Sequence, residues 1–266
     1  MNEIATYLLL GIIEGLTEFL PVSSTGHLIL AGALLGFEGE SSVAFKIAIQ
    51  FGAILAVLVA YWRRFWGVAD GMMRRDPASW AFTRNILIGF LPALAIGVVA
   101  YDAIRAAIQT PLLVAVMLVL GGIAILLIER MVKQVRFESV EGVPTRTALA
   151  IGVVQCLAMV PGVSRSGATI MGALLMGVER KTAAEFSFFL AVPTMAAAAS
   201  YALWKDRALL SADDMAAIGI GLVTSFIVAL AVVKAFVTIV SRYGFAPFAW
   251  YRIVVGSLAL VWLLAR

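Results

Sequence analysis

The sequence has little charge. Of its 266 residues, 14% are charged and 62% are hydrophobic, and the mean hydropathy is +1.01. Soluble domains are far more polar, so we predict a single all-α integral membrane domain over residues 1–266. The net charge of +4 does not indicate a nucleic-acid partner, because the basic residues gather in short loops, as they do in membrane proteins.

Cysteine and histidine occur once each. The single Cys156 excludes an internal disulfide, and we expect it to be a small buried side chain within its apolar run. The single His27 excludes a mechanism that needs two histidines, one as nucleophile and one as acid. The first residues carry no basic segment and no cleavage site, so we expect no removable signal peptide.

Six segments are long enough to cross a bilayer core as helices, which takes about 20 apolar residues. They cover residues 42–62, 82–101, 111–129, 184–204, 213–235 and 247–265. Two further apolar regions, 3–36 and 147–178, are interrupted by Pro21–Gly26 and Pro161–Gly167, which leaves half-segments too short to cross. We predict that both regions are re-entrant helix-turn-helix hairpins.

Basic residues predict the orientation, since Lys and Arg accumulate on the cytoplasmic side. One side of the predicted topology holds only Arg105, Lys205, Arg207 and Arg266. The other side holds Arg63, Arg64, Arg74, Arg75, Arg84, Arg130, Lys133, Arg136, Arg146, Arg180, Lys181, Lys234, Arg242 and Arg252. Both termini and the open end of the first hairpin should therefore face outward, and the second hairpin should enter from the cytoplasm.

The two interrupted regions resemble each other at an offset of 141 residues. The aligned pairs include Gly11 and Gly152, Glu14 and Gln155, Ser23 and Ser164, Thr25 and Ser166, and Gly26 and Gly167. Three predicted spans, an odd number, separate the copies, so residues 1–130 and 143–266 are predicted to form an inverted-topology repeat. Such repeats place the tips of broken helices near the membrane midplane, where two helix N-termini can face one anion.

Two carboxylates precede the first turn. Glu14 and Glu18 are four residues apart and would share one helix face. Pro21 cannot continue that helix, which we expect to end near Leu20. Carboxylate and phosphate oxygens together suit Mg²⁺ or Ca²⁺, so both glutamates are candidate metal ligands. The alternative is a structural pair hydrogen-bonded to the turn.

Both turns are predicted anion sites, because N-cap hydroxyls, free backbone N–H groups and the positive end of a helix dipole favour phosphate. Their candidate substrate-binding residues are Ser23, Thr25, Gly26, Gly162, Ser164, Ser166, Gly167 and Thr169. Ser23 and Ser24 also fit a purely capping role. An intramembrane Arg165 is costly unless it pairs with a glutamate or binds a ligand, and a guanidinium suits phosphate.

His27 lies one helical turn from Ser24, so the two side chains fit a nucleophile with a base, or His27 is a satisfied core histidine. An anion site, a cation site, an arginine and a nucleophile with a base are typical of phosphoryl transfer. The candidate catalytic residues are Glu14, Glu18, Ser24, His27 and Arg165.

Glu14–His27 and Pro161–Thr169 resemble the two signature motifs of the undecaprenyl pyrophosphate phosphatase family, integral membrane enzymes also called bacitracin resistance proteins. The resemblance extends over the chain, including Glu185–Pro193 and the Pro-Phe-Ala-Trp-Tyr-Arg run that ends at Arg252, with no departure at a signature position. It implies hydrolysis of undecaprenyl diphosphate to undecaprenyl phosphate and phosphate, which recycles the lipid carrier for peptidoglycan synthesis.

The resemblance further implies a divalent cation, a place in the bacterial plasma membrane and an active site that opens to the outer face. By position, Glu14 and Glu18 would organise the metal or assist deprotonation, Ser24 would attack, and His27 would shuttle the proton. Arg165, Ser164, Ser166 and Thr169 would hold the diphosphate. The choice of Ser24 over His27 as nucleophile stays open, as does the formation of a homodimer.

A lipid-phosphate flippase is the alternative function, since inverted repeats and broken helices also occur in transporters. Transport needs the anion site but no base beside a hydroxyl, so the Ser24 and His27 pair favours hydrolysis. A structural membrane protein with kinked helices would not need Arg165 or the two glutamates.

Overall fold

The computed structural model describes residues 3–37, 40–108, 110–132, 134–205 and 214–265. These residues are almost entirely helical, and the strand-like contact among them is an isolated bridge between Phe137 and Val178. The helices are α1 (Glu3–Thr17), α2 (Ser24–Leu35), α3 (Glu40–Ala60), α4 (Trp62–Met73), α5 (Pro77–Val99), α6 (Tyr101–Ile108), α7 (Pro111–Met131), α8 (Thr145–Gln155), the short 3-10 helix η1 (Cys156–Met159), α9 (Arg165–Leu175), α10 (Arg180–Lys205), α11 (Asp214–Tyr243) and α12 (Ala246–Leu264). The predicted all-α class is confirmed.

The long apolar helices match the predicted membrane-spanning segments. Within the described ranges, five helices are long and apolar enough to cross a membrane, namely α5, α7, α10, α11 and α12. The remaining predicted segment, 42–62, falls in α3, which is bent by 68° from α4 and makes a sixth span if the pair is counted as one. The bend comes where the apolar run gives way to Trp62, Arg63 and Arg64, a sequence suited to a membrane surface.

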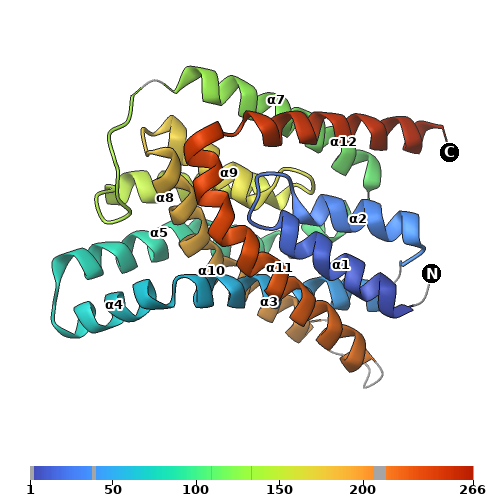
Figure 1. Cartoon of the computed structure of the whole chain (residues 1–266), viewed down its shortest axis with the longest axis horizontal. Coiled ribbons are helices and arrows are strands. Elements are labelled where there is room, and N and C mark those ends of the chain that lie inside the picture. Colours follow the sequence, from blue (N-terminus) through green and yellow to red (C-terminus); the bar gives the residue numbers. More distant parts are fainter. Residues whose placement is uncertain (1–2, 38–39, 109, 133, 206–213, 266) are drawn as a thin grey trace.

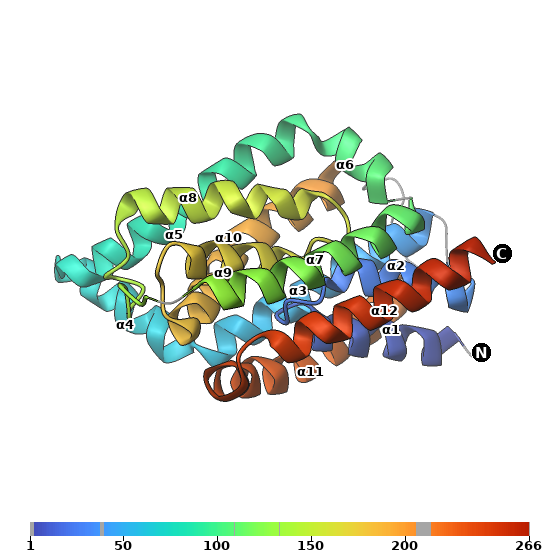
Figure 2. The same cartoon turned by 90° about the horizontal axis from the view of Figure 1, so that it is seen from above.

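Both interrupted regions form helical hairpins. α1 packs on α2, and α8 packs on α9. The first hairpin opens toward the end of the molecule that carries the termini, the second opens toward the opposite end, and their turns meet in the middle (Figures 1 and 2). α1 ends at Thr17 rather than near Leu20, although the Glu18 N–H still donates to the Glu14 carbonyl at 2.9 Å. The inverted repeat of residues 1–130 and 143–266 stays a prediction.

Close packing of α1 on α11 determines where the first carboxylate lies. A Cβ atom added at Gly15 would lie 2.7 Å from the Ser225 carbonyl oxygen of α11, so only glycine permits this approach. The contact presses one face of α1 into the interior, and Glu14 on that face is fully buried. α3 covers α11 as well, while α7 and α12 lie side by side across the other face of the site (Figure 2).

The predicted topology places both termini on one side of the membrane, and which side that is stays a prediction. Both termini lie at one end of the molecule (Figure 1), and Lys205 at that end pairs with Asp102 across 2.6 Å. Three of the counted residues, Lys133, Arg207 and Arg266, lie outside the described residues. The placement of Arg252 in a cytoplasmic loop is wrong, because this side chain is 1% exposed and lies within α12.

Candidate active site

The two turns have the same local geometry. Ser23 (φ 71°) and Ser164 (φ 79°) both adopt the left-handed conformation that non-glycine residues rarely occupy. Each serine caps the helix that follows it, since Ser23 Oγ accepts from the N–H of Gly26 at 3.3 Å and Ser164 Oγ accepts from the N–H of Gly167 at 3.0 Å. The predicted capping role is confirmed for Ser23, whereas Ser24 is the first residue of α2 and not its cap. Strain of about 1–3 kcal/mol at such a residue persists only where the surroundings fix it, and this occurs chiefly at functional sites.

A serine of the second turn joins the two turns. Ser166 Oγ donates to the Leu20 carbonyl at 2.7 Å and lies 3.0 Å from Ser164 Oγ. Ser166 is fully buried, so this bond lies between the turns and not at their surface. Thr25 is half-buried in the first turn of α2. The N-termini of α2 and α9 therefore approach each other in the centre of the molecule.

Glu18 connects the two hairpins. Its Oε1 accepts from Arg165 Nη2 at 2.9 Å, and its Oε2 accepts a short hydrogen bond from Ser24 Oγ. The side chains of Arg165 and Glu18 are only 13% and 7% exposed. The pairing of Arg165 with a glutamate, one of the two predicted alternatives, is confirmed. A carboxylate between a guanidinium and a hydroxyl is a proton acceptor that the arginine holds in place.

Arg165 is held by α10 as well as by Glu18. Its Nη1 donates to the Ser187 carbonyl at 2.9 Å and lies 3.2 Å from Ser187 Oγ. Thr169 lies behind this contact, 2.6 Å from Ser187 Oγ, and its hydroxyl also donates to the Arg165 carbonyl. Thr169 is 1% exposed, so it supports the arginine from within the protein; its predicted contact with substrate stays a prediction. The sequence analysis missed Ser187, whose signal is a polar residue in the apolar run Glu185–Pro193.

His27 forms hydrogen bonds with groups other than its predicted partner Ser24. Its Nδ1 lies 2.8 Å from the Ser23 carbonyl oxygen, and its Nε2 lies 2.9 Å from the Tyr251 hydroxyl. A carbonyl only accepts, so Nδ1 carries the hydrogen, and in the neutral ring Nε2 accepts from Tyr251. Ser24 donates to Glu18 and not to His27, so no hydrogen bond joins Ser24 and His27 in this structure. The strained backbone of Ser23 turns its carbonyl toward His27.

Replacing Tyr251 by phenylalanine is expected to free His27 Nε2 while leaving the Nδ1 hydrogen in place. Because the chain has one histidine, ¹⁵N-histidine labelling gives a single pair of ring resonances in NMR. The Nε2 resonance should move to the frequency of an unprotonated nitrogen without a donor. The matched control Tyr243→Phe, at an exposed tyrosine of α11, should leave both resonances unchanged. An unchanged Nε2 resonance in Tyr251→Phe would refute the contact.

Glu14 has the surroundings of a cation ligand. It is fully buried, and neither of its carboxylate oxygens has a hydrogen-bond partner among the described residues. An unpaired buried carboxylate is costly, so the residues fit a divalent cation beside Glu14. The described residues contain no cluster of three or more His, Cys, Asp or Glu suited to a metal, so a cation at Glu14 would need substrate oxygens or water as its other ligands.

Arg252 is the buried cation that the sequence analysis missed. Its guanidinium donates only to backbone carbonyls, including Pro21 of the first turn and Gly162 of the second. Gly162 has a φ of 93°, which glycine adopts without strain. The run that ends at Arg252 was noted in the sequence, but the position of Arg252 between two predicted spans suggested a basic residue of a loop.

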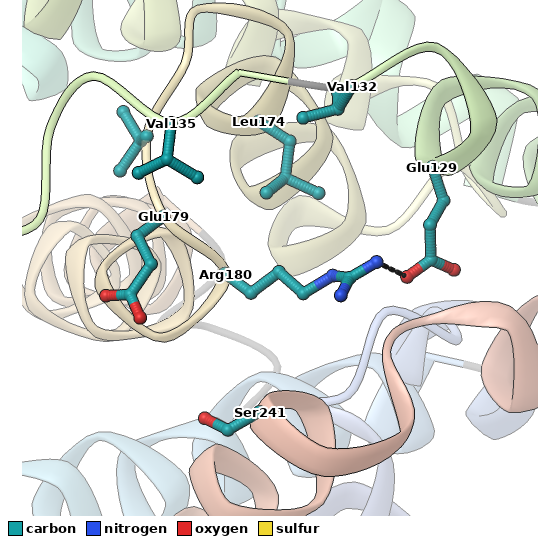
Figure 3. A pocket seen from close by; sticks show the side chains of 8 residues that line it. Glu129, Val132, Val135, Leu174, Glu179, Arg180 and Ser241 are labelled. Carbon is teal, nitrogen blue, oxygen red and sulfur yellow. Dashed lines mark hydrogen bonds and ion pairs between the residues drawn. The ribbon is translucent and has the colours of Figure 1, made fainter.

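A separate cavity of about 280 Å³ lies where α7 and α11 end and α10 begins (Figure 3). Glu129 accepts from Arg180 at 2.9 Å within it and also from the backbone N–H of Phe245. Its lining consists of Glu129, Val132, Val135, Leu174, Val178, Glu179, Arg180 and Ser241. None of the predicted site residues lines this cavity.

Comparison with known proteins finds one family model and close relatives. The family model described as bacitracin resistance protein BacA matches residues 7–258. The undecaprenyl-diphosphatase of Sphingopyxis alaskensis is 73% identical over 263 residues, or 99% of each chain. The undecaprenyl-diphosphatase of Rhizorhabdus wittichii is 60% identical over 264 residues, again 99% of each chain. That of Novosphingobium aromaticivorans is 53% identical over 270 residues and covers both chains fully.

Proposed function

Because the chain belongs to the bacitracin resistance protein family, we propose that it hydrolyses undecaprenyl diphosphate to undecaprenyl phosphate and inorganic phosphate. It is a multi-pass membrane phosphatase that recycles the lipid carrier for peptidoglycan synthesis and confers bacitracin resistance. The single observation that carries the proposed chemistry is a pair of hydrogen bonds: Glu18 accepts one from the Arg165 guanidinium and one from the Ser24 hydroxyl.

The first step transfers the terminal phosphoryl group to Ser24. Its Oγ forms a bond to the terminal phosphorus while its proton passes to Glu18 Oε2. The bond between that phosphorus and the bridging oxygen breaks, and undecaprenyl phosphate leaves with the bridging oxygen. Arg165 and the N-termini of α2 and α9 neutralise the charge on the phosphate oxygens, which is the main task in phosphoryl transfer.

The second step releases phosphate from Ser24. Water attacks the phosphorus and gives its proton to the Tyr251 hydroxyl oxygen while Tyr251 passes its own proton to His27 Nε2, the phosphorus–Oγ bond breaks, and Glu18 returns its proton to Ser24. His27 then loses its proton to solvent, so atoms and charges balance. His27 as the nucleophile is the competing assignment, and residual turnover in Ser24→Ala with full loss in His27→Ala would favour it.

A divalent cation, Mg²⁺ or Ca²⁺, is part of the proposal. Glu14 and Glu18 would hold it, and the bound ion would supply positive charge beside the phosphate oxygens. The unpartnered, fully buried carboxylate of Glu14 supports this assignment. The substrate-binding roles of Ser23, Thr25, Gly26, Gly162, Ser164, Ser166, Gly167 and Thr169 belong to the same proposal.

The proposed location is the bacterial plasma membrane, with the site open to the outer face. The first hairpin supports this direction, since it opens at the end of the molecule that carries both termini, the end with few basic residues (Figure 1). A flippase is not favoured, because transport does not need a carboxylate bonded to a hydroxyl at the anion site.

Purified protein in detergent is expected to release phosphate from undecaprenyl diphosphate, and EDTA should abolish the release. Mn²⁺ binding, followed by electron paramagnetic resonance, gives a second readout that does not depend on turnover. Glu14→Gln should weaken Mn²⁺ binding, whereas Glu3→Gln at the exposed start of α1 should not. Protein that binds the lipid but releases no phosphate would overturn hydrolysis, and EDTA-resistant release would overturn the cation requirement.

A further inference from the structure

Arg252 uses every hydrogen-bond donor of its guanidinium on backbone carbonyls. Nε donates to Leu118 at 3.2 Å, Nη1 to Pro21 at 3.1 Å and Val163 at 2.9 Å, and Nη2 to Met117 at 3.0 Å and Gly162 at 2.7 Å. The side chain is 1% exposed, and a guanidinium has five N–H donors, so none is left over. One side chain therefore holds the first turn, the second turn and α7 at once.

None of the five acceptors is a carboxylate. The guanidinium stays protonated, so its full charge is balanced only by the partial charges of carbonyl dipoles. That charge lies directly behind the two turns proposed to hold the diphosphate. Within a low-dielectric interior it adds to the attraction that Arg165 and the helix N-termini exert on an anion.

Two glycines of α7 leave room for the Arg252 side chain and for the close approach of α12. A Cβ atom added at Gly121 would overlap the guanidinium of Arg252, with Nη2 and Cζ as the nearest atoms. At Gly122, a Cβ atom would lie 2.7 Å from the Ala249 carbonyl oxygen, so α12 also approaches α7 closely there. Gly121 therefore gives a way to displace Arg252 without removing it.

We propose that Arg252 is a positioning residue of the diphosphate site, an inference that rests on the proposed function. In a planar trans peptide the N–H points away from the preceding carbonyl. When Arg252 holds the Val163 carbonyl, the Ser164 N–H points to the opposite side, and the start of α9 is fixed relative to Pro21 of the first turn. Arg252 thus sets the distance between the two anion-binding helix ends.

The test compares Gly121→Ala and Arg252→Lys with Gly219→Ala, a glycine of α11 with open space around its Cβ position. Gly121→Ala and Arg252→Lys should lower kcat about 10²-fold, the loss expected for a displacement near 1 Å in an active site, while Gly219→Ala keeps wild-type rates. Lysine has three N–H donors, so it cannot hold all five carbonyls. Both variants should also shift the His27 ring resonances, because Pro21 and Ser23 belong to the same turn.

The outcomes separate this proposal from the proposed function. If wild-type protein and Gly219→Ala hydrolyse the substrate and the folded Gly121→Ala and Arg252→Lys variants keep wild-type kcat and KM, Arg252 is only a structural residue and the proposal is wrong. Thermal midpoints establish that the compared protein is folded. If wild-type protein does not hydrolyse the substrate, the proposed function fails, and unchanged His27 resonances in Gly121→Ala would overturn the positioning role independently.

Discussion

Glu18→Gln is expected to reduce phosphate release by roughly 10³-fold, within the range of about 10²–10⁴-fold for loss of a positioned proton acceptor. The amide keeps the shape of the carboxylate but is a far weaker base, so Ser24 loses the group that takes its proton. Arg165 loses its charged partner in the same substitution. The measurement is kcat in detergent with undecaprenyl diphosphate, with the thermal midpoint recorded for each protein, because an unpaired buried charge also destabilises the fold.

The matched control is Glu129→Gln. Glu129 pairs with Arg180 at 2.9 Å, the same distance as between Glu18 and Arg165, but it lies in the separate cavity of Figure 3. Its loss should leave kcat close to the wild-type value. Near wild-type kcat in Glu18→Gln would show that Glu18 does not take the proton from Ser24. Equal losses in both variants would indicate a general effect on the fold.

Local sequence patterns predicted the helices and the two turns well, because their causes are local. Apolar runs of membrane length, a proline after Glu18 and an N-cap serine in each turn act within a few residues. Arg165 was found because an arginine in an apolar segment needs a partner or a ligand. The end of α1 at Thr17 was not predicted, but the Glu18 N–H still donates to the Glu14 carbonyl at 2.9 Å, so the two glutamates keep the predicted spacing of one helical turn.

The long-range contacts of the site left weaker signals. Arg252 lies within α12, close to the loop that precedes this helix. Its partners are backbone carbonyls, which exist at every position and leave no pattern in side-chain types. Tyr251 and Ser187 lie in largely apolar helices, and their partners His27 and Arg165 lie far away in the sequence. The spacing of one helical turn between Ser24 and His27 predicted that the two side chains form a pair, but tertiary contacts give each side chain another partner.

Arg165→Ala is expected to lower kcat/KM by about 10³-fold, and Arg165→Lys should recover little of that loss. The guanidinium donates from Nη2 to Glu18 and from Nη1 to the Ser187 carbonyl, which fixes its plane. An ammonium group is a single point charge without that planar fork, so arginine and lysine are not interchangeable here. Arg105→Ala, on α6 at the end that carries the termini, is the control.

A double-mutant cycle shows whether Arg165 and Glu18 act as one unit. If Arg165 works by holding the carboxylate that deprotonates Ser24, then the Glu18→Gln/Arg165→Ala protein should be little worse than either single variant, since residues of one unit are strongly non-additive. Additive losses would mean that Arg165 acts on the phosphate independently of Glu18. Full activity of Arg165→Lys would contradict both roles of the guanidinium, holding Glu18 and binding the phosphate, because it would show that the positive charge alone is sufficient.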